Sequence, residues 1–129
     1  MKILVVTAAI IEARGKYLIA QRRKDSHQGL RWEFPGGKVE SGESPETCLA
    51  REIKEELDVN IEVGHIYKVI SHNYDDKQVI LLCYKCKILD GQPQPIECED
   101  FKWVIPELMS GFDFAPADIP VVEAIQKGE

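Results

Sequence analysis

The chain has 129 residues, of which 44% are hydrophobic and 29% are charged, and its formal net charge at pH 7 is −6. This size and balance predict a single globular domain, residues 1–129, with a substantial core. The acidic charge argues against a protein that binds a nucleic acid polymer, which normally presents a basic surface. It leaves a nucleotide substrate open, because a bound metal ion can neutralise the phosphates.

No apolar run approaches the ~20 residues that a membrane-spanning helix requires. The N-terminal run ILVVTAAII has no cleavage-like site after it, so it fits a buried strand better than a signal peptide. The cysteines lack the spacing of a zinc site, and a C-x-x-C within a strand points its thiols to opposite faces. We therefore expect no membrane contact, a cytoplasmic location and four reduced thiols, which are Cys48, Cys83, Cys86 and Cys98.

The first part of the chain predicts a hairpin. Residues 3–11 are apolar and β-branched, which is typical of a central strand, and residues 16–22 return after a short turn. Arg22 and Arg23 stand at the end of the second strand, before a polar loop at residues 24–29. Such an arginine is either solvated or reaches a phosphate, because its planar fork matches the oxygens.

An aromatic segment then leads into a pair of glycines, Gly36 and Gly37. We expect Trp32 to lie in the core. Phe34 has two open interpretations, because it can join the core or form one wall of a base pocket, since every base has a π-face. The glycines would let the backbone approach a ligand closely.

Residues 45–57 are predicted to form a helix. Ser44 followed by Pro45 gives an N-cap with proline in the first turn, where a missing N–H does no harm. One face of this helix is apolar at helical spacing and carries Leu49, Ala50, Ile53 and Leu57.

Three glutamates of this helix, Glu52, Glu55 and Glu56, project from one side because they are spaced i, i+3 and i+4. A glutamate-rich side is usually a solvated face, here softened by Arg51 and Lys54. It can instead bind a hard cation such as Mg²⁺, which takes oxygen ligands and often shares them with a substrate phosphate. The surrounding sequence favours the second interpretation.

The second half of the chain predicts a hairpin of residues 61–74 and 78–89, a strand at 101–104 and a short helix at 106–109. Asp118 is expected to be the N-cap of a last helix, with Pro120 in its first turn. Strands flanked by these two helices indicate the α/β class, with a mixed sheet and a helix on each side.

The segment from Gly37 to Val59 resembles the signature of the Nudix hydrolases. Gly37 is followed after five residues by Glu43, after seven more by the run Arg51-Glu52-Ile53-x-Glu55-Glu56, and then by Val59. The family usually has glycine where this chain has Asp58, just after the helix. Aspartate tolerates a left-handed conformation there, so we expect a modest loss of stability and intact chemistry. The resemblance implies a Nudix-type α/β/α sandwich with a mixed β-sheet.

Matching positions implies roles for individual residues. Glu52, Glu55 and Glu56 would bind the metal ion, with Glu52 as the candidate general base and Arg51 orienting a neighbouring glutamate. A glycine carbonyl joins the metal ligands in the family, and we assign this to Gly36. Glu97, six residues before Trp103, is either a further metal ligand or an exposed loop residue. MutT-type members carry an equivalent arginine pair, which favours Arg23 as the phosphate contact. Glu43 is expected to close the loop.

The implied reaction is Mg²⁺-dependent hydrolysis, with Mn²⁺ as an alternative ion, of a nucleoside triphosphate to the monophosphate and pyrophosphate. The tail APADIP resembles both MutT-type and CTP-type pyrophosphohydrolases, and places the base contact on Asp118. An ionised aspartate only accepts hydrogen bonds, which suits the amino groups of cytosine and guanine better than the carbonyls of uracil or thymine. CTP and other cytosine or guanine nucleotides, including their oxidised forms, are therefore the expected substrates. An N-cap is the competing explanation for Asp118.

Other interpretations remain open from the sequence. The substrate could be ADP-ribose, a dinucleoside polyphosphate or a nucleotide sugar, and the protein could be a monomer or a homodimer. A Nudix-like domain that only binds nucleotides is a further alternative, although such domains typically lose the glutamates. The last is an acidic interaction domain, whose glutamates would be a solvated surface.

Overall fold

The computed structural model describes residues 1–129 and is built on a seven-stranded mixed sheet. Five strands lie side by side in the order β3-β2-β1-β6-β5, while β4 pairs with β1 and β7 pairs with β2. β1 and β6 run parallel, and all other pairs are antiparallel. In chain order the strands are β1 (Lys2–Ala13), β2 (Lys16–Gln21), β3 (Trp32–Glu33), β4 (Gly36–Lys38), β5 (Asn60–Asn73), β6 (Lys77–Asp90) and β7 (Asp100–Val104).

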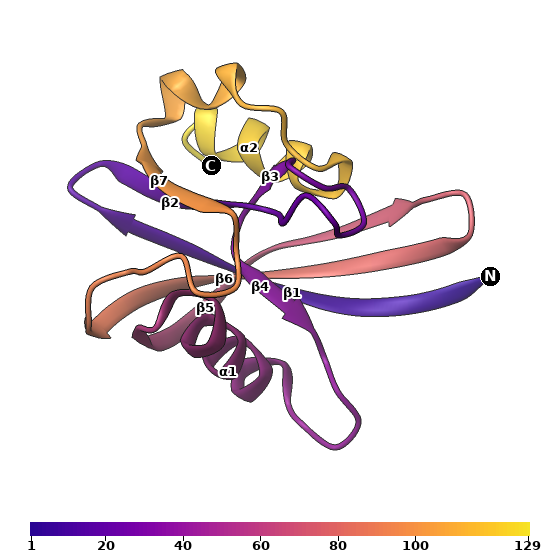
Figure 1. Cartoon of the computed structure of the whole chain (residues 1–129). Coiled ribbons are helices and arrows are strands. Elements are labelled where there is room, and N and C mark those ends of the chain that lie inside the picture. The colour runs from indigo at the N-terminus through magenta and orange to yellow at the C-terminus, as the bar shows by residue number, and fades with distance from the viewer.

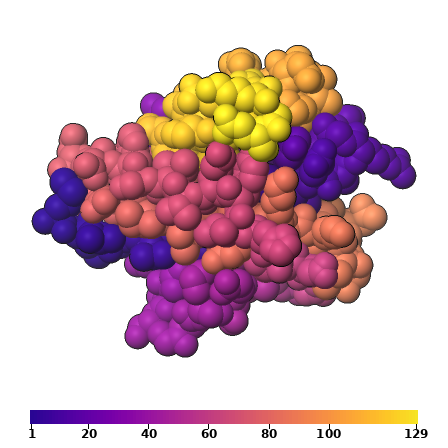
Figure 2. Space-filling view, turned by 180° about the vertical axis from the view of Figure 1, so that it is seen from behind, coloured from indigo at the N-terminus to yellow at the C-terminus, as the bar shows by residue number.

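Helical elements cover both faces of this sheet. Figure 1 shows α1 (Pro45–Leu57) below it and α2 (Ile119–Gln126) above it, together with the 3-10 helices η1 (Pro106–Gly111) and η2 (Pro116–Asp118). The view from behind in Figure 2 has the same order of layers, with the C-terminal helix over the strands and α1 beneath them. The predicted α/β/α sandwich is confirmed. Neither α1 nor α2 is long and apolar enough to span a bilayer.

β1 is the central strand, as predicted, because its side chains alternate between two separate cores. Ala8 and Ile10 belong to the core beneath α2, whereas Ala9 and Ile11 belong to the core against α1. The same alternation puts Cys83 and Cys86 in different cores, and all four cysteines are free.

The start of α1 follows the sequence prediction. Ser44 is the N-cap, its Oγ accepts a hydrogen bond of 3.1 Å from the Thr47 N–H, and Pro45 lies in the first turn. The helix ends at Asp58, whose backbone is left-handed, with φ 56° and ψ 40°. The backbone N–H of Asp58 bonds to the carbonyl of Lys54, as expected for a helix C-terminus.

Asp58→Gly should stabilise the protein by about 1 kcal/mol, because glycine adopts this left-handed conformation without steric strain. The substitution removes an ion pair of 2.9 Å between Asp58 Oδ1 and Lys54 Nζ, but both groups are more than half exposed and such pairs contribute little. Urea denaturation followed by circular dichroism measures the gain. An unchanged or lower midpoint would show that the aspartate side chain does more than end the helix.

Asp118 occupies the N-cap position of α2, as predicted, but its side chain does not cap the helix. Its backbone is already helical, with φ −86° and ψ −19°, because η2 runs directly into α2, and its side chain makes no capping hydrogen bond. The carboxyl turns instead to the backbone N–H of Phe34, which donates to Asp118 Oδ1 at 3.0 Å. Asp118 is buried in consequence, with 6% of its surface exposed.

Candidate active site

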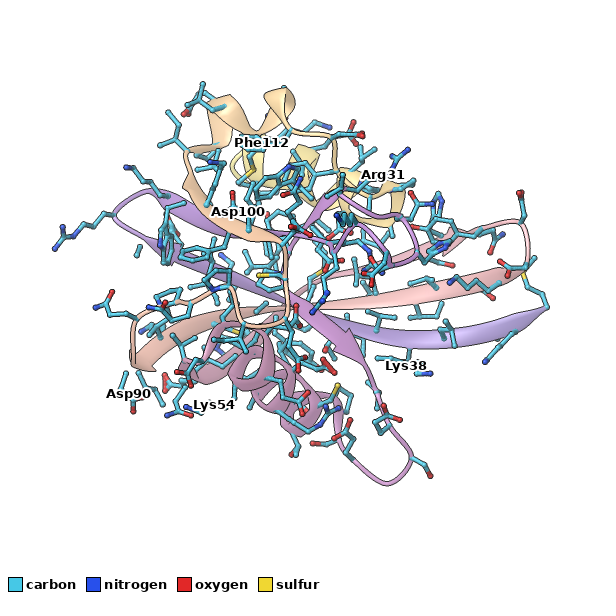
Figure 3. The ribbon with its side chains drawn as sticks, in the orientation of Figure 1. Arg31, Lys38, Lys54, Asp90, Asp100 and Phe112 are labelled. Carbon is cyan, nitrogen blue, oxygen red and sulfur yellow. The ribbon has the colours of Figure 1, made fainter.

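A cavity of about 330 Å³ lies beside the glycine pair and reaches Asp118. Gly36, Gly37 and Glu52 line one part of it, and Phe34 and Asp118 line another. Figure 3 marks Lys38, which also lines the cavity, at the end of β4, and shows side chains filling the space between β4 and α1. Apolar side chains from the first half of β1 and the start of β6 complete the lining, namely Leu4, Val6, Val79 and Leu81.

The two glycines are required for different reasons. In the antiparallel pairing of β4 with β1, Gly36 lies opposite Ala8 and Gly37 lies opposite Thr7. A Cβ atom on Gly36 would collide with the backbone carbonyl of Thr7, whereas a Cβ atom on Gly37 would collide with the carboxyl group of Glu52. Gly36 therefore permits the strand pairing, and Gly37 permits the Glu52 carboxyl to rest against the backbone.

The carbonyl group of Gly36 is left free by the strand pairing. The Ala9 N–H donates to the Pro35 carbonyl at 2.7 Å. Because hydrogen-bonding positions alternate along an antiparallel pair, Gly37 shares the orientation of Pro35, and the Gly36 carbonyl faces away from β1. β4 pairs with β1 alone, so no other strand uses this oxygen. This orientation is what the predicted metal-ligand role of Gly36 requires.

Arg51 holds together the carboxylates on the exposed side of α1. Its Nη1 lies 3.2 Å from Glu52 Oε1 and 3.1 Å from Glu55 Oε1, and its Nη2 lies 2.7 Å from Glu43 Oε1. The hydrogen bonds from Arg51 and from the Glu40 N–H lower the pKa of Glu43 to about 2. Glu43 thus closes the loop before α1, and Arg51 both orients Glu52 and forms the i, i+4 pair with Glu55.

Glu56 differs from its neighbours because its carboxyl is buried. Oε2 has no hydrogen-bond partner. Burial raises the pKa of Glu56 well above its ordinary value, and the charges of Glu33 and Glu52 raise it further. Burial also raises the pKa of Glu52, which the nearby Arg51 partly offsets. The interpretation of the glutamates as solvated is therefore wrong for Glu56, whereas it fits Glu55, whose side chain is exposed.

A loop before β7 covers the end of α1 and brings Glu97 into the region. The N–H groups of Ile96 and Glu97 donate to the Glu56 carbonyl at 3.0 and 3.2 Å, and the Gln94 N–H donates to the Leu57 carbonyl at 2.9 Å. These bonds satisfy carbonyls that a helix end leaves without partners. The side chain of Glu97 is exposed, yet its charge still raises the pKa of Glu52 and of Glu56.

The residues around Gly37 fit a divalent cation in chemistry, although no three acidic, histidine or cysteine side chains are gathered tightly enough to form a metal centre by themselves. Glu56 provides a buried carboxylate oxygen without a partner, and Gly36 provides a free carbonyl. Carboxyl groups that raise one another's pKa lie where a positive charge is favourable. An oxygen-only ligand set of this kind suits Mg²⁺.

The opposite part of the cavity joins an aromatic wall to a second acidic pair. Phe34 is a core residue that stacks on Phe114 with ring centroids 5.6 Å apart, and it also lines the cavity. Burial raises the pKa of Asp118 well above its ordinary value, and the charge of Glu33 adds to this effect. Burial also raises the pKa of Glu33, against the opposing influence of Arg22, whose Nη1 lies 2.8 Å from Glu33 Oε1.

Backbone hydrogen bonds far apart in sequence bring Asp118 to Phe34. The Trp32 N–H donates to the Asp113 carbonyl at 2.9 Å, and the Ala115 N–H donates to the Trp32 carbonyl at 2.9 Å. The segment before η2 therefore runs along β3, and this places Asp118 beside Phe34. Trp32 is buried in the core, as predicted.

The arginine pair is divided between two environments. Arg22 lines the cavity and is fully engaged, because its Nε donates to the His27 carbonyl at 2.6 Å in addition to the pairing with Glu33. Arg23 lies outside the cavity lining, with 58% of its side chain exposed and only a long contact of 3.8 Å to Asp25. Sequence analysis missed Glu33, whose only signal is an acidic residue between two buried aromatics.

Comparison with known proteins decides the family. The NUDIX domain model matches residues 1–125. The chain belongs to the NUDIX family. Its Nudix signature runs from β4 through the following loop and along α1, which are the elements that hold the glycine pair, Arg51 and the glutamates.

Several relatives align with this Nudix chain over nearly its whole length. The CTP pyrophosphohydrolase of Escherichia coli (strain K12) is 42% identical over 126 residues, which is 96% of this chain and 92% of the relative. The 8-oxo-dGTP diphosphatase of the same strain is 28% identical over 128 residues, 98% of this chain and 99% of the relative. The solution structure of the E. coli ORF135 protein is 39% identical, covers 98% of this chain and 91% of its own, and superposes with a TM-score of 0.83.

Proposed function

We propose that this Nudix protein is a Mg²⁺-dependent nucleoside triphosphate pyrophosphohydrolase that acts on CTP or on oxidised guanine or cytosine nucleotides. The observation that carries the proposal is one cavity of about 330 Å³ lined both by Glu52 and the glycine pair and by Phe34 and Asp118. A nucleotide has the same two parts, a charged phosphate chain and an aromatic base. Relatives named CTP pyrophosphohydrolase and 8-oxo-dGTP diphosphatase support this substrate class.

The metal ligands in this proposal are the Gly36 carbonyl and the carboxylates of Glu52, Glu55, Glu56 and Glu97. Bound Mg²⁺, or Mn²⁺ in its place, would neutralise phosphate charge and lower the pKa of a coordinated water. The oxygen-only ligand set is the reason for preferring these hard ions. Arg51 would keep Glu52 and Glu55 in place through the contacts of 3.2 and 3.1 Å.

Glu52 is the proposed general base. Its carboxylate takes a proton from water while the water oxygen bonds to one phosphorus, and the bond from that phosphorus to the leaving group breaks. The products are the nucleoside monophosphate and pyrophosphate, without a covalent enzyme intermediate. Arg23 is the proposed phosphate contact on the family resemblance. It lies outside the cavity lining but is exposed and weakly paired, whereas Arg22 lines the cavity and is held by Glu33 and the His27 carbonyl.

The base would lie among Phe34, Tyr74 and the apolar side chains of β1 and β6, with Asp118 as the polar contact. The raised pKa of Asp118 changes the sequence-based argument, because burial favours the neutral carboxyl over the ionised form assumed there. A neutral carboxyl offers one O–H donor beside its acceptor oxygens. Cytosine presents a matching amino donor and ring nitrogen acceptor side by side. Guanine presents an N–H beside a carbonyl, and uracil and thymine present the same two groups, so the neutral carboxyl by itself does not separate these bases.

Asp118→Asn should change the ranking of cytosine and guanine nucleotides over UTP and dTTP while leaving the fold intact. The amide oxygen can still accept the hydrogen bond from the Phe34 N–H, but the second carboxyl oxygen, which in the neutral acid both donates and accepts, becomes an NH2 group that only donates. Kinetic constants for the four nucleotides in wild type and variant measure this effect. An unchanged ranking would remove Asp118 from base recognition.

The same variant gives a stability test. The raised pKa of Asp118 means that the folded protein holds this proton more tightly than the unfolded chain, whose value is about 3.9. The free energy of unfolding therefore falls as pH rises from about 3.9 through the raised folded pKa. Asparagine does not titrate, so the stability of the variant does not fall for this reason. The melting temperature of the variant relative to that of wild type should therefore increase as pH rises. A difference that stays constant with pH would contradict a neutral, buried Asp118.

The deciding experiment is a panel of nucleoside triphosphates, natural and oxidised, assayed with and without Mg²⁺, with products separated by anion-exchange chromatography. We expect monophosphate and pyrophosphate in equal amounts, only with the metal, and fastest release from CTP or an oxidised nucleotide. Two monophosphates from ADP-ribose, or a nucleoside monophosphate and a nucleoside di- or triphosphate from a dinucleoside polyphosphate, with triphosphate substrates left intact, would overturn the proposal. Binding without hydrolysis would do so as well.

A further inference from the structure

A buried polar pair lies directly beneath the glycine strand. Thr7 in β1 is 1% exposed and Cys48 in α1 is 0% exposed. Thr7 Oγ1 donates to the Gly37 carbonyl at 3.0 Å, and Cys48 Sγ lies 3.4 Å from the Lys38 carbonyl. The two side chains also touch, with Oγ1 and Sγ 3.6 Å apart. The consecutive carbonyls of Gly37 and Lys38 in β4 are thus each contacted by a buried side chain, one from β1 and the other from α1.

The core does not require these polar atoms. Valine has the shape of threonine and suits a strand equally well, and alanine suits a helix better than cysteine does. Thr7 is nevertheless one of the two buried residues of the polar and charged types, and it is 1% exposed, whereas the other, Asp118 in the cavity, is 6% exposed. A hydroxyl in such a place is expected to have a specific partner, and its partner here is the peptide next to the proposed metal site.

Holding this peptide affects the atoms on either side of it. The Glu52 carboxyl rests where a Cβ atom of Gly37 would be, and the free carbonyl of Gly36 is one residue earlier. A rotation of the Gly37 carbonyl would therefore displace both groups. Glycine has the widest backbone freedom of any residue. The pairing of β4 with β1 restrains the Gly37 peptide, and the Thr7 hydroxyl adds a further hydrogen bond to its carbonyl.

We propose that Thr7 and Cys48 are positioning residues that hold the Gly37–Lys38 carbonyls, and thereby set the Gly36 carbonyl and the Glu52 carboxyl in place to bind the divalent ion. This inference rests on the metal-dependent function proposed above. Thr7 is among the residues that line the cavity, but it is 1% exposed and its hydroxyl is turned to the Gly37 carbonyl, so in this role it acts through the backbone. Cys48 lies outside the lining and acts in the same way. Groups that orient metal ligands typically affect metal affinity by about 10- to 100-fold.

The test compares Thr7→Val, Thr7→Ser and Cys48→Ala with wild type, using Cys86→Ala as the matched control. Cys86 is buried in the core against α1, away from the glycine strand, so its replacement makes the same change elsewhere. Binding of Mn²⁺ is followed by the paramagnetic resonance of the free ion, with and without a nucleoside triphosphate. Thermal unfolding of the metal-free proteins is measured in parallel.

We expect Thr7→Val to weaken Mn²⁺ binding by about tenfold and to raise the Mg²⁺ concentration for half-maximal rate by more than it lowers kcat. Thr7→Ser should restore both values, because it keeps the hydroxyl. Cys48→Ala should weaken binding less, since a thiol is a weak donor, and Cys86→Ala should leave affinity unchanged.

Unchanged Mn²⁺ affinity in Thr7→Val, or a serine variant that binds as poorly as the valine variant, would overturn the inference. If Thr7→Val does not fold, Cys48→Ala against Cys86→Ala decides, and equal affinities would overturn it. A wild-type protein that takes up no Mn²⁺ would overturn the proposed function and this inference together. Normal uptake by wild type with no effect of Thr7→Val would overturn this inference alone.

Discussion

Glu56→Gln should lower the rate of nucleotide hydrolysis by about 10²- to 10³-fold and at the same time raise the melting temperature of the metal-free protein. The variant removes a negative charge from the proposed metal site, which explains the loss of rate. It also removes the cost of burying that charge, because Oε2 of Glu56 is buried without a partner and its pKa lies well above the ordinary value. A buried charge that is needed for function lowers the stability of the fold, so its removal is expected to reduce activity and to increase stability.

Steady-state kinetics and differential scanning calorimetry measure the two effects, and Glu123→Gln serves as the control. Glu123 is an exposed residue of α2, so the same chemical change there should alter neither quantity. Mg²⁺ with a nucleoside triphosphate should stabilise wild type more than Glu56→Gln, by mass action. A variant that keeps its rate would exclude Glu56 from the metal ligands, and one that loses stability would contradict the burial argument.

Gly37→Ala and Gly36→Ala should fail in different ways. At position 37 the new methyl group meets the Glu52 carboxyl, with Oε1 at 2.6 Å, and this flexible side chain can move aside. The protein should fold, while hydrolysis falls by about 10²-fold or more because the proposed general base is displaced. At position 36 the methyl group meets the backbone of β1, which cannot yield, so β4 should detach and the protein should be severely destabilised.

Gly111→Ala is the control for both variants, because a Cβ atom there meets nothing within 4 Å. Circular dichroism and urea denaturation report the fold, and the pyrophosphate assay reports activity. Parallel loss of stability in both variants would mean that Gly37 serves strand pairing and not the placement of Glu52. Full activity in Gly37→Ala would show that hydrolysis does not depend on the position of the Glu52 carboxyl.

Features set by neighbouring residues were predictable from the sequence. Ser44 and Pro45 start α1 where local capping rules place its start, and the spacing of Leu49, Ile53 and Leu57 gives its buried face. The alternation along a strand separates Cys83 from Cys86 in the same way. Five of the seven strands formed where apolar runs and turns indicated them, whereas the short strands β3 and β4 were not predicted.

Features that depend on distant partners were not predictable. Helical periodicity places Glu56 beside Glu52 on one side of α1, but it does not reveal that the loop before β7 bonds to the end of that helix. Asp118 has the sequence of an N-cap, yet its partner is an N–H group 84 residues earlier. The contact of Thr7 with Gly37 likewise depends on the pairing of two strands 30 residues apart. Tertiary contacts override local preference at each of these positions.

The two parts of the cavity are assembled from the chain in unlike ways. The glycine pair and Glu52 come from a single run of residues, 36 to 52, whereas the aromatic and apolar part draws on β1, β3, β6 and η2. A change in one scattered position therefore leaves the continuous run untouched. Substitutions in the scattered part can therefore alter which nucleotide a related protein selects, while the continuous run that carries the proposed catalytic residues is inherited unchanged.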